Sequence, residues 1–68
     1  MRVFAQRLKE LREEKRLSQV GLAQATGISK SAIGAWEVDR TDISGDNLII
    51  LAKYFGVTVG YLLGTEDV

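Results

Sequence analysis

The sequence predicts an all-α protein, a compact bundle of five short helices. Three observations support this fold class. Apolar residues recur every three or four positions in several separate segments, as the buried face of a helix requires. Serine, threonine and glycine stand between these segments, where helices begin and end. No segment alternates polar and apolar residues as a half-buried β-strand does. We expect residues 1–68 to form a single domain, since a chain of this length rarely holds two.

The first helix is expected at Val3–Lys15. Phe4, Leu8 and Leu11 follow the i, i+4, i+7 spacing of one helical face. Charged residues recur throughout this segment, so it has no apolar stretch of the kind found in a secretory signal.

Two shorter helices are expected next, at about Gln19–Thr26 and Lys30–Val38. Ser18 and Ser29 precede them, and each hydroxyl can accept a hydrogen bond from an otherwise unpaired N–H of the first turn. Gly27 stands between the two helices and can take the positive φ that a tight turn requires.

The same segment has the spacing of two helices that cross at a steep angle. Ala23, four residues before Gly27, leaves room for the second helix to pass close by. Ile33 lies six residues after the glycine and is expected to point into the core, together with Trp36. Such an arrangement presents the opposite face of the second helix, which could enter the major groove of DNA.

The C-terminal half is predicted to hold two more helices. A loop at Asp39–Ser44 precedes a helix at Asp46–Phe55, whose apolar residues again recur at i, i+3, i+4 and i+7. Gly56 is expected to end that helix, and Thr58 to cap a short last helix that runs to Leu63.

Composition excludes several classes of function. The chain has no cysteine and no histidine, so disulfides, a thiolate metal site and the commonest general base are absent. We therefore expect no enzyme, no metal and no cofactor, and no small-molecule ligand is evident. The longest apolar run, Leu48–Ala52, is far shorter than the roughly 20 residues that span a bilayer. A cytoplasmic protein without a membrane partner is expected.

Charge is unevenly distributed along the chain. Nine basic and nine acidic residues give no net charge, which is unusual for a nucleic-acid-binding protein. However, residues 1–30 carry seven bases and three acids, whereas residues 31–68 carry two bases and six acids. One small body can therefore have a basic face and an acidic face.

Ordered motifs across nearly the whole chain resemble the helix-turn-helix domains of the lambda-repressor/Cro type, also called the XRE family. The resemblance implies a lambda-repressor-like bundle whose helix-turn-helix is formed by the second and third helices. It also implies sequence-specific binding of double-stranded DNA by a transcriptional regulator, a repressor acting as a dimer on a two-fold operator. The motifs are RLKELR at Arg7–Arg12, LSQ at Leu17–Gln19, LA at Leu22–Ala23, GIS at Gly27–Ser29, WE at Trp36–Glu37, NLIILAKYFGV at Asn47–Val57 and YLLG at Tyr61–Gly64.

Helical geometry and the resemblance together suggest the DNA-contacting residues. If Ile33 and Trp36 face the core, 100° per residue turns residues 30, 31, 34 and 35 outward. The resemblance places base contacts on this face and phosphate contacts beside it. The expected base-contacting residues are Lys30, Ser31 and Ala35. The expected phosphate-contacting residues are Gln19, Ser29, Arg40 and Thr41.

Other residues are expected to hold the motif in place: Arg12, Ala23, Gly27, Ile33, Trp36 and Glu37. The resemblance pairs Arg12 with Glu37, which would tie the first helix to the end of the third. The chain departs from the usual family pattern at Asp39, where glycine is usual, at Ile43, where proline is common, and at Gly21, where glutamate is common.

Two questions remain open from the sequence. The C-terminal half has more apolar residues than one narrow core-facing stripe can bury. Some of them complete the core and others could form a dimer patch: Ile49, Ile50, Val59, Tyr61 and Leu62. The alternative function is a protein-interaction module of the same fold, such as an antitoxin-like or adaptor domain, which the neutral net charge favours. The operator, the regulated genes, the sign of regulation, any effector and the full length of the regulator cannot be read from this pattern.

Overall fold

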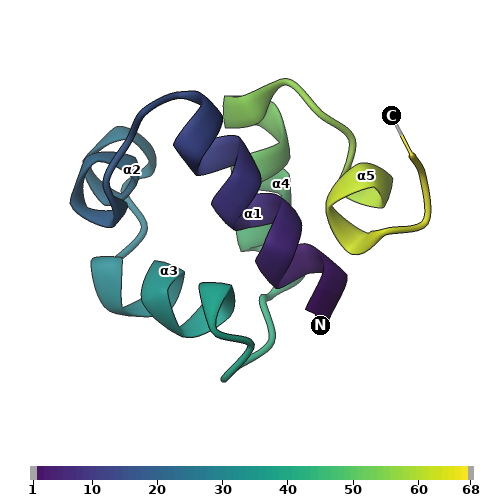
Figure 1. The fold of residues 1–68 in the computed structure, drawn as a ribbon, viewed down its shortest axis with the longest axis horizontal. Helices are drawn as coiled ribbons and strands as arrows, with labels where there is room; N and C mark the ends of the chain where they lie inside the picture. Colours follow the sequence, from purple (N-terminus) through teal and green to yellow (C-terminus); the bar gives the residue numbers. More distant parts are fainter. Residues whose placement is uncertain (1, 68) are drawn as a thin grey trace.

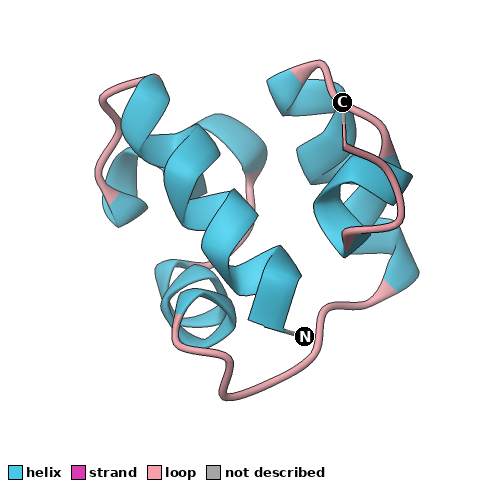
Figure 2. Cartoon of the chain, turned by 45° about the vertical axis from the view of Figure 1, so that its right-hand side comes forward, coloured by secondary structure: helices cyan, strands magenta, loops and turns pink. Residues whose placement is uncertain are grey.

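A computed structural model describes residues 2–67, and five helices account for their regular structure (Figures 1 and 2). This confirms the predicted all-α fold class. Met1 and Val68, which belong to the predicted domain, lie outside the described residues. The helices are α1 (Arg2–Glu14), α2 (Gln19–Thr26), α3 (Lys30–Glu37), α4 (Gly45–Phe55) and α5 (Val59–Leu63).

Side-chain oxygens cap the N-termini of four helices. Ser18, Ser29 and Thr58 accept hydrogen bonds from the backbone N–H three residues later, at 2.9, 3.1 and 2.9 Å, as the sequence predicts. Ser44 does the same for Asn47 at 3.4 Å. Because Ser44 caps α4, that helix begins at Gly45, one residue earlier than the predicted Asp46.

The end of α3 depends on a non-glycine residue with positive φ. Asp39 adopts φ 58°, the left-handed conformation for which glycine is usual and aspartate is tolerated. The turn brings the Arg40 N–H to the Ala35 carbonyl at 2.8 Å and the Asp39 N–H to that of Trp36 at 3.1 Å. The helix therefore stops at Glu37, and the backbone of Arg40 is fixed against its last turn.

The core lies where all five helices meet. Phe4, Leu8, Leu22, Ile33, Leu51 and Leu62 are its most deeply buried large side chains. Phe4 of α1 contacts Trp36 of α3 edge to face, with ring centroids 6.2 Å apart. This contact, together with the buried Ile33, holds α3 with one face against α1 (Figure 1).

The C-terminal apolar residues that exceeded one core-facing stripe are divided between the core and the surface. Leu62 is buried, Val59 and Tyr61 are partly buried, and Ile49 and Ile50 on α4 are 48% and 40% exposed. Ile43, predicted only as part of a loop, is a core residue with 8% exposure. Within residues 2–67, no helix combines the length and apolar character needed to cross a membrane.

Candidate nucleic-acid interface

The turn between α2 and α3 has the geometry of a helix-turn-helix. Gly27 adopts φ 78°, and its N–H donates to the carbonyl of Ala23 at 2.9 Å. Ile28, the next residue, is buried, so the turn itself is anchored in the core. Ser29 then starts α3 in a new direction. Since Ile33 and Trp36 occupy the inner face of α3, its opposite face is presented outward.

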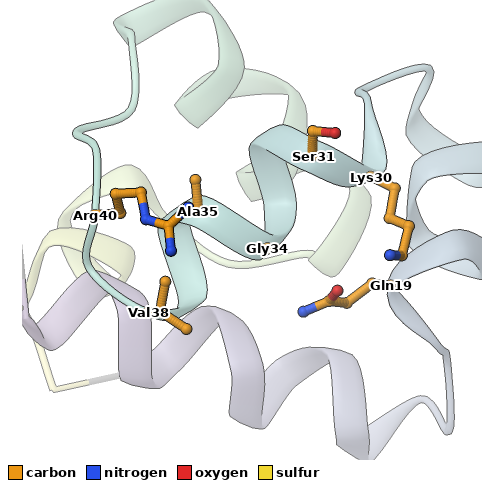
Figure 3. A pocket seen from close by; sticks show the side chains of 7 residues that line it. All are labelled: Gln19, Lys30, Ser31, Gly34, Ala35, Val38 and Arg40. Atoms are coloured by element: carbon orange, nitrogen blue, oxygen red, sulfur yellow. The ribbon is translucent and has the colours of Figure 1, made fainter.

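A shallow concavity lies over this outward face. Its lining residues come from the start of α2, from α3 and from the turn that follows α3 (Figure 3). Five of the seven predicted DNA-contacting residues belong to the lining: Gln19, Lys30, Ser31, Ala35 and Arg40. Figure 3 shows Lys30 and Gln19 at one end of the concavity and Arg40 and Val38 at the other.

Two predicted phosphate-contacting residues do not line the concavity. Ser29 is exposed just before α3, and its hydroxyl oxygen accepts the N-cap hydrogen bond from Ala32. Thr41 is exposed in the loop, next to Arg40. Both residues are therefore sequence neighbours of lining residues, but neither lines the concavity itself.

Val38 is a lining residue that the sequence reasoning missed. It was predicted as the last residue of the third helix, but it follows the helix as the C-cap. Its side chain is 65% exposed, the highest value among the large apolar residues described. The signal was present in the spacing, because residues 31, 34, 35 and 38 form one helical stripe.

The charge of the lining differs from the charge of the chain. Lys30 and Arg40 are basic, and none of the seven lining residues in the described part of the chain is acidic. The concavity is therefore lined by two positively charged side chains, one on α3 and one in the turn after it, although the whole protein is neutral. Gly34 and Ala35 lie between these charges. Because their side chains are absent or small, a large partner can approach the helix backbone closely here.

A buried ion pair fixes the end of α3 to α1. Arg12 donates to both carboxylate oxygens of Glu37, from Nε at 2.7 Å and from Nη2 at 2.9 Å. The structure thus contains the pair that the resemblance implied. The Arg12 side chain is 11% exposed and that of Glu37 only 3%. The hydrogen bond from Arg12 to Glu37 raises the already high pKa of the guanidinium, so Arg12 stays charged.

The ion pair extends into a network that joins three helices. Arg12 also donates to the carbonyl of Leu17 at 2.6 Å, just before α2. Gln19, the first residue of α2, donates from Nε2 to Oε1 of Glu37 at 3.2 Å. Glu37 therefore receives donors from α1 and α2 while it belongs to α3. This network sets the orientation of α3 relative to its neighbours by directional bonds in addition to core packing.

These features define a class of protein: a small helical domain whose helix-turn-helix presents one outward helix face lined by small residues and flanked by two positively charged side chains. The comparisons assign the family. The chain belongs to the lambda-repressor/Cro-type (XRE) helix-turn-helix family, because a family model described as helix-turn-helix matches residues 8–62. Curated relatives of the chain are named transcriptional regulators and phage repressors.

Three curated relatives illustrate the family. The chain is 38% identical over 65 residues to an uncharacterised HTH-type transcriptional regulator, YobD, of Bacillus subtilis, covering 96% of this chain and 58% of YobD. It is 34% identical to the HTH-type transcriptional activator BcrR of Enterococcus faecalis, covering 94% of this chain and 31% of BcrR. It is 31% identical to repressor protein C2 of Salmonella phage P22, covering 90% and 28%.

The chain thus spans between about a quarter and three fifths of the length of these relatives. No solved structure matches the chain significantly.

Proposed function

We propose that the chain is the DNA-binding domain of a transcriptional regulator, formed by residues 1–68, and that α3 enters the major groove. One observation carries this proposal: Gln19, Lys30, Ser31, Ala35 and Arg40, selected from the sequence, converge on one concave face with two positive charges. A major groove about 12 Å wide accommodates an α-helix.

Three residues of α3 are proposed to read bases. Lys30 suits the O6 and N7 acceptors of guanine, Ser31 can donate or accept, and Ala35 can contact a thymine methyl group. Lys30 and Ser31 are exposed in the first turn of α3, and Ala35 lies one turn further along the same face. The N-terminal half of a reading helix is the part that ordinarily meets base edges.

Phosphate contacts are proposed to flank these readers. Arg40 supplies a charge at the far end of the concavity, where the turn at Asp39 holds its backbone. Ser29 and Thr41 are exposed hydroxyl residues on either side of α3. Such contacts set the register on the duplex and carry no sequence information. Gln19, at the start of α2, is proposed to hold a further phosphate at the other end of the concavity.

We further propose a repressor that acts in the cytoplasm as a homodimer on a two-fold operator. A chain of this size buries only about 60% of its unfolded surface, so a second copy would add stability. Ile49 and Ile50 on α4 provide exposed apolar area for such a contact. Among the relatives, C2 of phage P22 and the immunity repressor of Bacillus phage phi105 are named repressors. No cofactor is proposed.

A protein-interaction module is the second candidate function. The observation in its favour is Val38, an exposed apolar side chain next to the small residues Gly34 and Ala35. An apolar strip of this kind could also pack against a protein helix.

Gly34→Ala should raise the stability of the fold and weaken DNA binding. Glycine in a helix interior is unfavourable relative to alanine, so we expect the free energy of unfolding to rise by about 0.5–1 kcal/mol. The added Cβ would meet Oε1 of Gln19 at 3.5 Å, an ordinary contact. The same methyl group would stand on the face that approaches DNA, so affinity for DNA should fall.

Gly45→Ala is the matched control, because a Cβ there meets nothing within 4 Å. Urea unfolding and duplex titration of both variants provide the measurement. Unchanged DNA affinity in Gly34→Ala would show that nothing approaches this part of α3 closely.

Salt dependence distinguishes the two candidate functions. Arg40 from two protomers would neutralise two phosphates, which gives a slope of log affinity against log salt of about −1.8. Affinity for duplex DNA should then fall about 12-fold between 50 and 200 mM salt. Fluorescence anisotropy with labelled duplex measures this slope. A slope near zero would contradict contact with phosphates and favour the protein-interaction module.

A further inference from the structure

We propose that two copies of the chain pair through α4, with the two helices antiparallel and related by a two-fold axis at the level of Ile49 and Ile50. The pairing rests on the proposed function, in which the chain acts as a homodimer, and it names the surface that forms the dimer. Three features of the structure support it: an exposed apolar pair, the charges on either side of that pair, and the separation of α4 from the concavity.

The outer face of α4 carries two adjacent isoleucines. Ile49 and Ile50 are 48% and 40% exposed, whereas Leu48, Leu51 and Ala52 of the same helix are buried. The inner face of α4 therefore completes the core without the two isoleucines. Their exposed surface can be removed from water when a second apolar surface covers it, which is favourable.

Two opposite charges extend this apolar pair along the helix. Asp46 lies in the first turn of α4 and Lys53 in its last turn, and both side chains are exposed. Residues 46, 49, 50 and 53 have the i, i+3, i+4, i+7 spacing of one helical face. Neither charge forms an ion pair within residues 2–67. These four residues, which we call the α4 stripe, run from a negative charge over two isoleucines to a positive charge.

The α4 stripe is complementary to a second copy of itself in one orientation. Its charges lie seven residues apart, about 10.5 Å along the helix, and the isoleucines stand midway between them. In an antiparallel pair, Asp46 of each copy faces Lys53 of the other and the isoleucines meet in the centre. In a parallel pair, like charges face each other. The charges therefore select the antiparallel pair, whereas the isoleucines supply most of the affinity, since exposed ion pairs contribute little.

Pairing through α4 leaves the concavity free. None of the residues that line the concavity belongs to α4, which packs against α2 and α5. Each copy therefore keeps the outward face of α3 available, and the second copy does not compete with DNA for this surface.

Sedimentation equilibrium without DNA measures the pairing. Because the contact is small, the wild-type chain should dimerise weakly, with a dissociation constant between about 1 μM and 1 mM. Ile50→Gln should weaken dimerisation at least about tenfold. Val20→Gln is the matched control, because Val20 is 45% exposed on α2, outside the α4 stripe. It should dimerise as the wild-type chain does.

Charge reversal tests the orientation of the two helices. Asp46→Lys and Lys53→Asp should each dimerise at least about tenfold more weakly than the wild-type chain, because like charges then face each other at both ends of the pair. An equimolar mixture of the two variants should form a heterodimer, in which every lysine again faces an aspartate. The chain with both substitutions should dimerise as the wild-type chain does. Circular dichroism checks that each variant is folded.

Two results would overturn the proposal. One is a wild-type chain that stays monomeric at concentrations up to about 1 mM. The other is dimerisation of Ile50→Gln and of both charge-reversed variants as tight as that of the wild-type chain, which would place the contact elsewhere.

Duplexes that contain a single half-site of the selected sequence separate these results from failure of the proposed function. Ile50→Gln should bind a single half-site as the wild-type chain does, because α3 is unchanged, and should bind the two-fold duplex more weakly. Absence of any base preference in the wild-type chain, whatever its oligomeric state, would overturn the proposed function itself.

Discussion

Replacing Arg12 with methionine is expected to lower the free energy of unfolding by about 3–5 kcal/mol, the usual cost of removing one partner from a buried ion pair. The Glu37 side chain is 3% exposed, so its carboxylate would keep only the hydrogen bond from Gln19. The bond from Arg12 to the Leu17 carbonyl would also be lost. For a chain of this size, that cost is a large part of the total stability.

Two further variants make the Arg12→Met result interpretable. Lys9→Met removes an exposed charge from the same helix and should change stability by less than about 0.5 kcal/mol. The double variant Arg12→Met, Glu37→Leu removes both buried charges and should recover most of the loss. Urea unfolding measures all three. An Arg12→Met chain as stable as the wild-type chain would show that the pair contributes nothing.

The same ion pair should matter for DNA binding beyond its effect on stability. Under conditions where Arg12→Met remains folded, α3 loses its directional connection to α1. We therefore expect weaker binding of the selected duplex, together with chemical-shift changes along α3 in NMR spectra. Unchanged affinity and unchanged α3 resonances would show that core packing alone orients the helix.

Lys30→Ala and Ser31→Ala are expected to relax base preference, each at its own position in the site. A good contact to a base edge contributes about 1–3 kcal/mol of discrimination, so the two together could remove most of the preference carried by α3. Ser31→Ala should leave affinity for a scrambled duplex unchanged, because serine carries no charge. Lys30→Ala should weaken the scrambled duplex as well, because it removes a positive charge from the face that approaches DNA.

Lys53→Ala is the matched control for the loss of positive charge. Lys53 is exposed in the last turn of α4 and does not line the concavity. Competition binding with the selected and scrambled duplexes measures both effects. If Lys30→Ala and Lys53→Ala behave alike, Lys30 acts only through general charge.

Much of the fold was predictable because its signals are local. Ser18, Ser29 and Thr58 cap the helices predicted for them. Ile33 and Trp36 face inward because one helix turn separates them. The start of α4 was misplaced by one residue, since the capping role of Ser44 was not considered. Ile43 was missed as a core residue because a single apolar side chain in a polar loop has no periodicity.

The site was less predictable, because its decisive contacts join distant residues. Arg12 and Glu37 are 25 residues apart, and the expectation that they pair came from the family resemblance and not from spacing. The bond from Gln19 to Glu37 had no sequence signal, although it ties the start of α2 to the end of α3. Composition was also a poor guide to the site. The net charge of the chain is zero, but the lining of the concavity has two basic and no acidic residues.

Selection of the wild-type chain on a pool of random duplexes tests the central claim most directly. The account predicts enrichment of a two-fold sequence, with half-sites about 10 base pairs apart, one turn of the double helix. Sequencing the pool after successive rounds gives the result. Failure to enrich any sequence, with pool affinity no better than that of a scrambled duplex, would contradict the claim that α3 reads DNA.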